Sequence, residues 1–325
     1  MGVAGFGVVR WAMADASVNA GSSLPPISAD RSHILTEQRN PRSMNLDELS
    51  VAECVALINQ EDQAVIEALR QAGPAIAGFI SAVEPGFLAG GRLIYFGAGT
   101  SGRLGVLDAS EAPPTFQVPP DRIIGIIAGG DGSLRTSSEG REDEPEGVRA
   151  ELEKLKLTEG DAVLGIAAGG TTPYVVGGMA VAKSLCAGCI TGMLVCTPLS
   201  KPAAADHLIV LATGPEVLTG STRMKAGTGT KLALNTISTT LMVRSGRVYQ
   251  NLMVDVKASN AKLVDRAVRT IGMLTGLPRQ EGLALLMRAD GRVKAAVVMH
   301  KLGVTLAEAD AKLGAAGGKL RGVIG

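Results

Sequence analysis

The chain has 325 residues, which is enough for about two domains. Its 32 Lys and Arg nearly balance its 31 Asp and Glu, so there is no general positive field to hold nucleic acid or an acidic membrane surface. Glycine is abundant, with 42 residues, whereas aromatic residues make up only 3%. We therefore expect many turns and few aromatic platforms for single-stranded nucleic acid.

The chain begins with a segment that carries no clear structural signal. Residues 1–35 are predicted to be a poorly ordered extension, because the apolar stretch 1–9 is short and lacks the basic start and cleavage site of a secretory signal. The uncharged stretch 162–182 is long enough to cross a membrane, but its glycines and Pro173 divide it into two short buried elements. No membrane partner is expected.

Helical spacing of apolar residues predicts a helix over residues 45–85, which Pro74 is expected to kink or divide. Short apolar runs that end in glycine or small polar residues then predict strands at 92–96, 122–128, 162–168, 190–196 and 207–212. The 20–35 residues between successive runs leave room for helices. This alternation predicts an α/β fold, a doubly wound five-stranded parallel sheet that binds its ligand beyond the carboxyl ends of the strands.

Helices dominate the remainder of the chain. A longer one is predicted over residues 231–243, followed by short Ala- and Leu-rich helices at 261–274, 279–287, 293–302 and 305–313. We therefore expect a main domain over residues 36–250 and a small helical subdomain over residues 251–325.

The four cysteines are too few for a disulfide framework and favour a reducing compartment, the cytoplasm. Cys186 and Cys189 have the spacing of a redox or zinc motif, but no second such pair follows and the three histidines are scattered. We interpret all four as structural thiols and expect no metal site.

The strongest candidate for a ligand site is the first strand and its turn, GRLIYFGAGTSGRLG, residues 91–105. Its glycines allow a sharp turn, its hydroxyls can donate to phosphate, and the next helix presents unpaired N–H groups. The turn is not a Walker loop, and no acid closes the second strand as a dinucleotide site requires. The residues expected to bind a ligand here are Gly99, Thr100 and Ser101.

Two further segments are expected to meet this turn. The third strand ends in a similar turn with Gly170, Thr171 and Thr172, and both turns lie at the carboxyl edge of the predicted sheet. A phosphosugar suits this pair better than a nucleotide, since no aromatic residue stands ready to stack on a base. Ser221, Arg223 and Lys225 form a cationic, hydroxyl-rich cluster at a predicted helix start, for which ordinary helix capping is the alternative.

Carboxylates are the expected acid–base groups, because the predicted strand ends hold no histidine except His207, at a strand start. Glu111 lies where two prolines are expected to stop the first crossover helix, near the mouth of the site. Glu142 follows the second strand in SSEGREDEPEG. The neighbouring acids are interpreted as solvated surface residues: Glu139, Asp143, Glu144 and Glu146.

From about Thr36 to its C-terminus the chain closely resembles the N-acetylmuramic acid 6-phosphate etherases, a family built on the sugar isomerase (SIS) phosphosugar-binding fold. The matching segments are TEQRNP (36–41), INQEDQAV (58–65), GRLIYFGAGTSGRLGVLDASEAPPTF (91–116), GIIAGG (125–130), GIAAGGTTPYVVGG (165–178), GPEVLTGSTRMKAGT (214–228) and NLMVDV (251–256).

The resemblance implies a homodimeric enzyme without a cofactor that cleaves the D-lactyl ether of N-acetylmuramic acid 6-phosphate, giving N-acetylglucosamine 6-phosphate and D-lactate. It implies that Glu111 and Glu142 are the catalytic carboxylates. Opening the sugar ring acidifies the C2 hydrogen, lactate leaves C3 by β-elimination, and water adds to the double bond. Our hypothesis is that Glu142 takes the C2 proton while Glu111 protonates the leaving lactate and later activates water.

One departure from the family concerns the third-strand turn. It usually reads AASGRTPY and here reads AAGGTTPY, so a serine hydroxyl is lost at Gly169 and an arginine at Thr171. Backbone N–H groups and Thr172 remain to hold phosphate, but losing a charged hydrogen bond costs about 1.5–3 kcal/mol. Two alternatives follow: a phosphosugar sensor of the same fold without turnover, and an aldose–ketose phosphate isomerase, which would release no lactate.

Overall fold

The computed structural model describes residues 30–136, 139–256 and 260–325, and residues 32–325 form one compact unit. The prediction of a poorly ordered extension falls mainly on residues 1–29, which lie outside the described residues. Its last residues differ from the expectation, since Ile34 is buried and a 3₁₀ turn, η1, occupies Leu35–Glu37. Within the described ranges no helix is both long and apolar enough to cross a membrane.

The core of the fold is the predicted five-stranded parallel sheet, with strand order β2-β1-β3-β4-β5. Strands β1 and β3 are buried along their whole length, which explains why they read as continuous apolar runs. The strands are β1 (Leu93–Gly97), β2 (Ile123–Ile127), β3 (Ala162–Ile166), β4 (Ile190–Val195) and β5 (His207–Val210).

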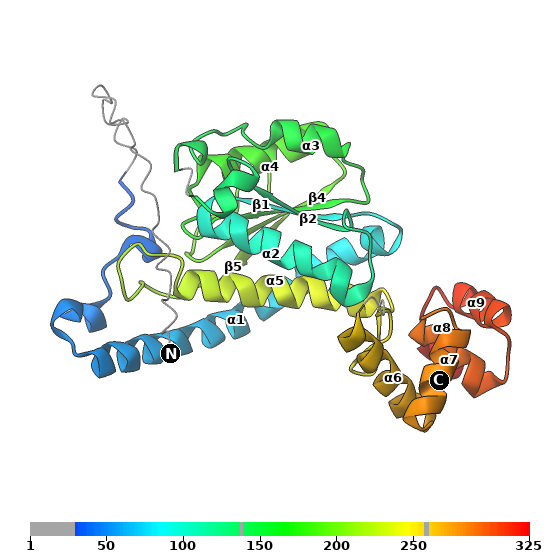
Figure 1. Cartoon of the computed structure of the whole chain (residues 1–325). Helices are drawn as coiled ribbons and strands as arrows, with labels where there is room; N and C mark the ends of the chain where they lie inside the picture. Colours follow the sequence, from blue (N-terminus) through cyan, green and yellow to red (C-terminus); the bar gives the residue numbers. More distant parts are fainter. Residues whose placement is uncertain (1–29, 137–138, 257–259) are drawn as a thin grey trace, which may run out of the picture. The chain divides into compact units, whose positions relative to one another are not determined.

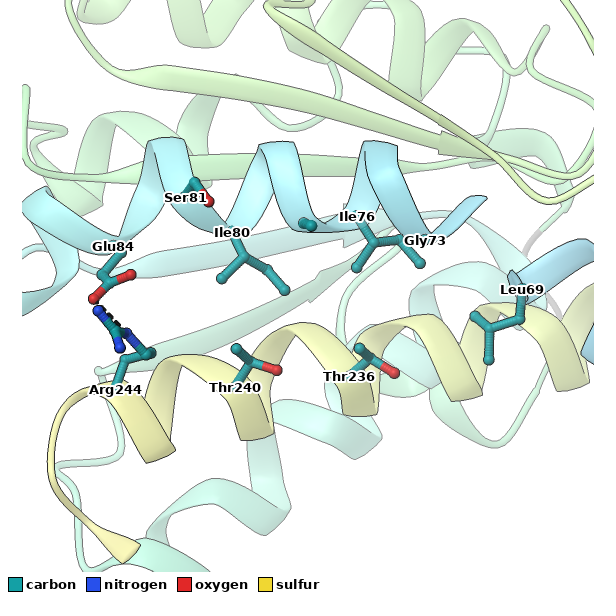
Figure 2. Close-up of a pocket in the computed structure, with 10 residues that line it drawn as sticks. Leu69, Gly73, Ile76, Ile80, Ser81, Glu84, Thr236, Thr240 and Arg244 are labelled. Carbon is teal, nitrogen blue, oxygen red and sulfur yellow. Dashed lines mark hydrogen bonds and ion pairs between the residues drawn. The ribbon is translucent and has the colours of Figure 1, made fainter. Parts of the chain in front are cut away.

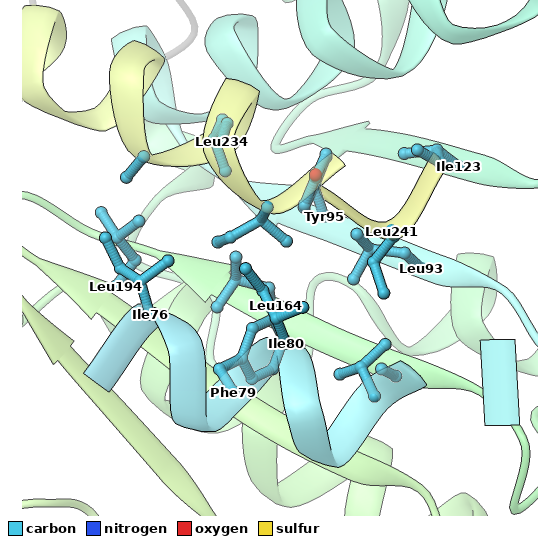
Figure 3. Packing of buried hydrophobic residues seen from close by; sticks show 14 of the residues in the cluster. Ile76, Phe79, Ile80, Leu93, Tyr95, Ile123, Leu164, Leu194, Leu234 and Leu241 are labelled. Carbon is cyan, nitrogen blue, oxygen red and sulfur yellow. The ribbon is translucent and has the colours of Figure 1, made fainter. Parts of the chain in front are cut away.

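Helices cover both faces of the sheet, as Figure 1 shows. One face packs against α1 (Val51–Leu88), α2 (Gly99–Phe116) and α5 (Lys225–Arg244), through the cluster in Figure 3. The other face packs against α3 (Arg149–Leu155) and α4 (Pro173–Leu185). The chain is therefore doubly wound, as the alternation of strands and helices predicts.

Helix α1 is one continuous element, so of the two outcomes expected at Pro74, a kink or a division, the division does not occur. Pro74 lies on the exposed side of the helix, so the carbonyl that loses its N–H partner can be solvated. The helix begins with a capping box, in which Ser50 and Glu53 satisfy each other's backbone N–H groups. Two 3₁₀ turns precede it, η2 (Pro41–Ser43) and η3 (Leu46–Glu48).

The part of the chain after α5 is mainly helical and has its own apolar cluster, as predicted for the C-terminal region. A short hairpin of β6 (Val248–Tyr249) and β7 (Leu252–Met253) precedes the helices. The helices are α6 (Ala261–Thr275), α7 (Arg279–Arg288), α8 (Val293–Leu302), α9 (Leu306–Ala315) and α10 (Arg321–Ile324). The last of these and the hairpin were not anticipated from the sequence.

Candidate functional site

The strand order places a topological switch point at β1. The chain leaves β1 through α2 on one face to reach β2, and then crosses through α3 on the other face to reach β3. The connections diverge at the carboxyl ends of β1 and β3, where open α/β sheets bind their ligands. The two predicted phosphate-binding turns follow these two strands, Gly97–Ser101 and Ala167–Thr172.

The turn after β1 depends on close backbone approaches. A Cβ added at Gly102 would lie 2.5 Å from the carbonyl oxygen of Gly97, and one at Gly97 would lie 2.9 Å from that of Ile166. Gly99, the first residue of α2, has a φ of +51° that favours glycine. The first turn of α2 therefore presents its N–H groups beside the end of β3.

Arg103 joins this turn to the loop after β2. Its Nε donates to the carbonyl oxygen of Leu134 at 3.2 Å and its Nη2 to that of Ser133 at 2.7 Å. Both acceptors belong to the 3₁₀ turn η4 (Asp131–Leu134), which follows the glycines at the end of β2. The side chain of Arg103 therefore positions η4 against the first turn of α2, a role that was not predicted from the sequence.

Glu142 lies beside the second turn. Its backbone carbonyl accepts a hydrogen bond of 3.0 Å from the N–H of Tyr174, in the first turn of α4. A Cβ at Gly177 would lie 2.1 Å from the carbonyl oxygen of Pro145, so this loop packs closely on α4. The loop begins with the 3₁₀ turn η5 (Glu139–Arg141). The backbone of Glu142 is thus held at the start of α4, the helix that follows the turn with Gly170, Thr171 and Thr172.

The third predicted segment meets the first. A Cβ at Gly227 would lie 3.4 Å from Cγ2 of Thr100 and 3.3 Å from the carbonyl oxygen of Thr222. The start of α5 therefore packs against the first turn of α2. Ser221 and Thr222 are half-buried, while Arg223 is exposed.

Lys225 differs from the prediction that it binds an anion. Its ammonium is buried and lies 2.7 Å from Oε2 of Glu61, on α1. The backbone N–H groups of Lys225 and Ala226 donate to the carboxylate of Glu216, at 3.0 and 2.9 Å. The N-terminus of α5 is therefore neutralised from within the chain, and we assign Lys225 a structural role instead of phosphate binding.

Glu61 is the centre of a buried polar cluster. It also accepts a hydrogen bond of 2.7 Å from Nδ2 of Asn40, and Nε of Arg42 lies 2.5 Å from its other oxygen. Burial alone would raise the pKa of this carboxyl, but hydrogen bonds from Lys225, Asn40 and Arg42 outweigh it and lower the pKa below its ordinary value. The cluster ties residues 40–42 to α1 and α5.

Glu111 lies on α2, but the helix does not stop at the two prolines that follow it. It continues to Phe116 and ends at Gln117, which adopts a left-handed conformation. Glu111 is exposed and, at a rise of 1.5 Å per residue, lies about 18 Å along the helix from Gly99. Within one chain it is therefore not beside the two predicted phosphate-binding turns, in contrast to the expectation that it lies near the mouth of the site.

Asp108, one turn before Glu111, faces inward and was not anticipated as a key residue. Its carboxylate accepts from the hydroxyl of Tyr95 at 3.1 Å and from that of Ser238 at 3.2 Å. Burial raises the pKa of Asp108. The aspartate of the DASE segment thus joins β1, α2 and α5.

The cysteines have the environment of structural thiols. All four are free, and burial raises the pKa of Cys189 and of Cys196 to about 12, so neither is a reactive thiolate. Among the described residues no group of three or more His, Cys, Asp or Glu side chains is arranged to hold a metal ion.

A large apolar groove lies away from the two predicted phosphate-binding turns. It has a volume of about 540 Å³ and runs between α1 and α5, with the ion pair of Glu84 and Arg244 at one end (Figure 2). None of the candidate ligand-binding residues lines it. The candidate site is the region of the two turns at the carboxyl ends of β1 and β3, where the strand order places the switch point.

This fold and these two turns define a phosphosugar-binding protein of the SIS class. A family model described as the glucokinase regulatory protein N-terminal SIS domain matches residues 75–183. The chain is 52% identical over 287 residues to an N-acetylmuramic acid 6-phosphate etherase of Synechococcus sp. (strain CC9605), covering 88% of this chain and 90% of that protein. It is 50% identical over 292 residues to the etherase of Rhizobium rhizogenes, covering 90% and 94%. The chain belongs to the N-acetylmuramic acid 6-phosphate etherase family.

Among solved structures, the chain is similar to a putative phosphosugar isomerase involved in capsule formation from Bacteroides fragilis NCTC 9343. The two are 19% identical, with a TM-score of 0.43, and the match covers 62% of this chain and 95% of that one.

Proposed function

We propose that this chain is a lyase that cleaves the D-lactyl ether of N-acetylmuramic acid 6-phosphate, releasing N-acetylglucosamine 6-phosphate and D-lactate. The observation that carries the proposal is an identity of about 50% to etherases over some 90% of the chain. The match spans both Glu111 and Glu142. A sensor without turnover would have no use for this pair of carboxylates.

The phosphate of the substrate binds between the two turns in this proposal. Backbone N–H groups at the starts of α2 and α4 converge there from the carboxyl ends of neighbouring strands. Hydroxyls of Thr100, Ser101, Thr171 and Thr172 add donors. Arg223 is exposed and is proposed to supply charge at the rim.

Glu142 is proposed to remove the C2 proton of the ring-opened sugar. Its hydrogen bond to the start of α4 keeps its residue next to the turn that binds phosphate. The electron pair of the C2–H bond then forms the C2=C3 double bond, and the C3–O bond to lactate breaks. Such proton transfer contributes about 10²–10⁴-fold to the rate.

Glu111 is proposed to give its proton to the departing ether oxygen and then to deprotonate the water that attacks C3, while Glu142 returns its proton to C2. Its position about 18 Å along α2 from the phosphate turn exceeds the length of one hexose phosphate. We therefore propose that Glu111 acts in the site of a second copy, so that each of two sites in a homodimer takes one acid from each chain.

The experiment that tests the function is incubation of the purified chain with N-acetylmuramic acid 6-phosphate, followed by separate measurement of D-lactate and sugar products. Lactate with N-acetylglucosamine 6-phosphate supports the etherase. Isomerised sugar without lactate would indicate an aldose–ketose isomerase. Saturable binding with neither product would indicate a sensor.

A further inference from the structure

Thr36 has a buried hydroxyl that no group in the described part of the chain satisfies. The residue is 0% exposed, and its Oγ1 has no hydrogen-bond partner among the residues described. A buried hydroxyl without a partner is unfavourable, so such a group in a well-packed protein calls for an explanation. Its surroundings supply one.

The segment that carries Thr36 is fixed over the carboxyl edge of the sheet. The backbone N–H of Leu35 donates to Oγ1 of Thr197, just past the end of β4, at 3.0 Å. Ile34 is buried at 3% exposure, and Asn40 is anchored to Glu61. The orientation of Thr36 is therefore set by contacts on both sides of it.

Thr36 faces the second phosphate-binding turn. A Cβ built on Gly169 would lie 3.7 Å from Oγ1 of Thr36, 4.0 Å from Oγ1 of Thr171 and 3.6 Å from Cγ2 of Ile34. These are ordinary contact distances, so a small side chain fits at this position. Glycine leaves the space beside both hydroxyls unfilled.

The departure from the family sequence occurs at this same position. A serine at residue 169, as in AASGRTPY, would bring its hydroxyl within hydrogen-bonding reach of Oγ1 of Thr36, since the Cβ lies only 3.7 Å away. In this chain Gly169 supplies no such group. The hydroxyl of Thr36 therefore faces a position at which this chain supplies no hydrogen-bonding side chain.

We infer that Thr36 is a substrate-binding residue, and that its hydroxyl, together with that of Thr171, donates to a phosphate oxygen that enters the space beside Gly169. This inference rests on the proposed function for the identity of the sugar, but the ligand group it requires is a phosphate monoester or phosphate itself. The adjacent N-terminus of α4 favours negative charge in this space. The phosphate then satisfies the hydroxyl that the described part of the chain leaves unpaired.

The decisive variant is Thr36→Val, which keeps the shape of the side chain and removes the hydroxyl. Because no described residue pairs with the hydroxyl, the variant should fold with unchanged or higher thermal stability. Affinity for inorganic phosphate, measured by calorimetry, should fall about tenfold, and KM for N-acetylmuramic acid 6-phosphate should rise by a similar factor. Thr36→Ser keeps the hydroxyl and should restore both.

Gly169 offers the second arm of the test. Gly169→Ala fills the space without a donor and should weaken phosphate binding as Thr36→Val does, whereas Gly169→Ser should bind phosphate normally. Combining Thr36→Val with Gly169→Ala should weaken binding by less than the product of the two effects, because both remove the same contact. Thr213→Val, which removes another buried hydroxyl without a partner in the described ranges, is the matched control and should leave phosphate affinity unchanged.

Two results would overturn the inference. The first is a Thr36→Val protein that binds phosphate as tightly as the wild type does, with an unchanged KM. The second is a wild-type chain that binds neither phosphate nor the sugar phosphate. A wild-type chain that binds phosphate but releases no lactate would refute the proposed function alone, and the phosphate titration would still decide the role of Thr36.

Discussion

Lys225 and Glu61 form a buried ion pair, with Nζ and Oε2 only 2.7 Å apart and side chains 2% and 0% exposed. The pair joins the start of α5 to α1, and both helices cover the same face of the sheet. Since the start of α5 also packs against Thr100, the ion pair positions one wall of the proposed site. The ion pair affects the proposed site by holding the start of α5 in place, and it does not contact the substrate.

Replacing Lys225 by Met should destabilise the fold strongly. The change leaves the carboxylate of Glu61 buried without its closest cation, and breaking a buried pair in this way costs about 3–5 kcal/mol. Urea denaturation followed by circular dichroism measures the free energy of unfolding. Arg70→Met, which breaks the exposed pair with Glu67, is the control and should leave that free energy nearly unchanged. Equal losses in the two variants would refute the assignment.

The ion pair also predicts how stability depends on pH. Hydrogen bonds lower the pKa of Glu61 in the fold below its ordinary value of 4.5, so the unfolded chain takes up a proton at this carboxyl before the folded chain does. Its contribution is therefore present above pH 4.5 and is lost as the pH falls through the lowered pKa of the folded state. The difference in unfolding free energy between wild type and Glu61→Gln should therefore be constant well above pH 4.5 and should shrink as the pH falls below it. A difference independent of pH would contradict this.

The close approach at Gly102 predicts that alanine is not tolerated there. The added Cβ would lie 2.5 Å from the carbonyl oxygen of Gly97 and 2.7 Å from Cγ1 of Ile127, so the turn must shift. Such overpacking costs about 1–3 kcal/mol. A displaced phosphate site should lower kcat/KM about 10²-fold. Gly132→Ala, whose Cβ would meet no atom within 4 Å, should have little effect on either quantity.

The sheet was predictable from the sequence because each strand is specified by its own residues and by the turn that follows it. Strands β1 and β3 are buried on both faces, so each reads as an unbroken apolar run, and each ends where glycines begin the next turn. The carboxyl ends of parallel strands share one edge, which brings the two turns together. The fold class follows from these local patterns, and so does the place at which we propose that phosphate binds.

The role of Lys225 was not predictable in the same way. Its partner Glu61 is 164 residues away and, in the sequence, is one of two adjacent acids inside the predicted helix over residues 45–85. Nothing local distinguishes a lysine that binds a ligand from one that is neutralised by a distant carboxylate. The inward orientation of Asp108 was missed for a similar reason, since its partner Ser238 lies on another helix.

Helix ends were a further source of error. Pro113 and Pro114 read as a stop signal, but they lie near the end of α2, where few hydrogen bonds are lost, and the helix continues to Phe116. This extension keeps Glu111 within regular helix, on an exposed face. Its distance from the turn after β1 follows from helix geometry. The proposal that Glu111 and Glu142 act in one site therefore depends on a second copy of the chain.

The proposed roles of the two acids predict different exchange behaviour. In D₂O, Glu142→Gln should abolish both deuterium exchange at C2 and lactate release, because no base remains to remove the C2 proton. Glu111→Gln should retain exchange while lactate release falls about 10²–10⁴-fold. Glu144→Gln, which alters an exposed carboxylate of the same loop paired with Arg141, should affect neither. Normal lactate release by the Glu111 variant would refute its role.

A site shared between two chains predicts complementation between inactive variants. If Glu111 of one chain acts with Glu142 of the other, a heterodimer of Glu111→Gln and Glu142→Gln contains one site with both acids intact. Random mixing makes half of the dimers mixed, so co-expression of the two variants should recover about a quarter of wild-type lactate release. If both acids serve the site of their own chain, every site in the mixture lacks one of them and activity stays at the level of the single variants. Differently tagged chains, purified over both tags, allow the mixed dimer to be assayed alone, where half of wild-type activity is expected.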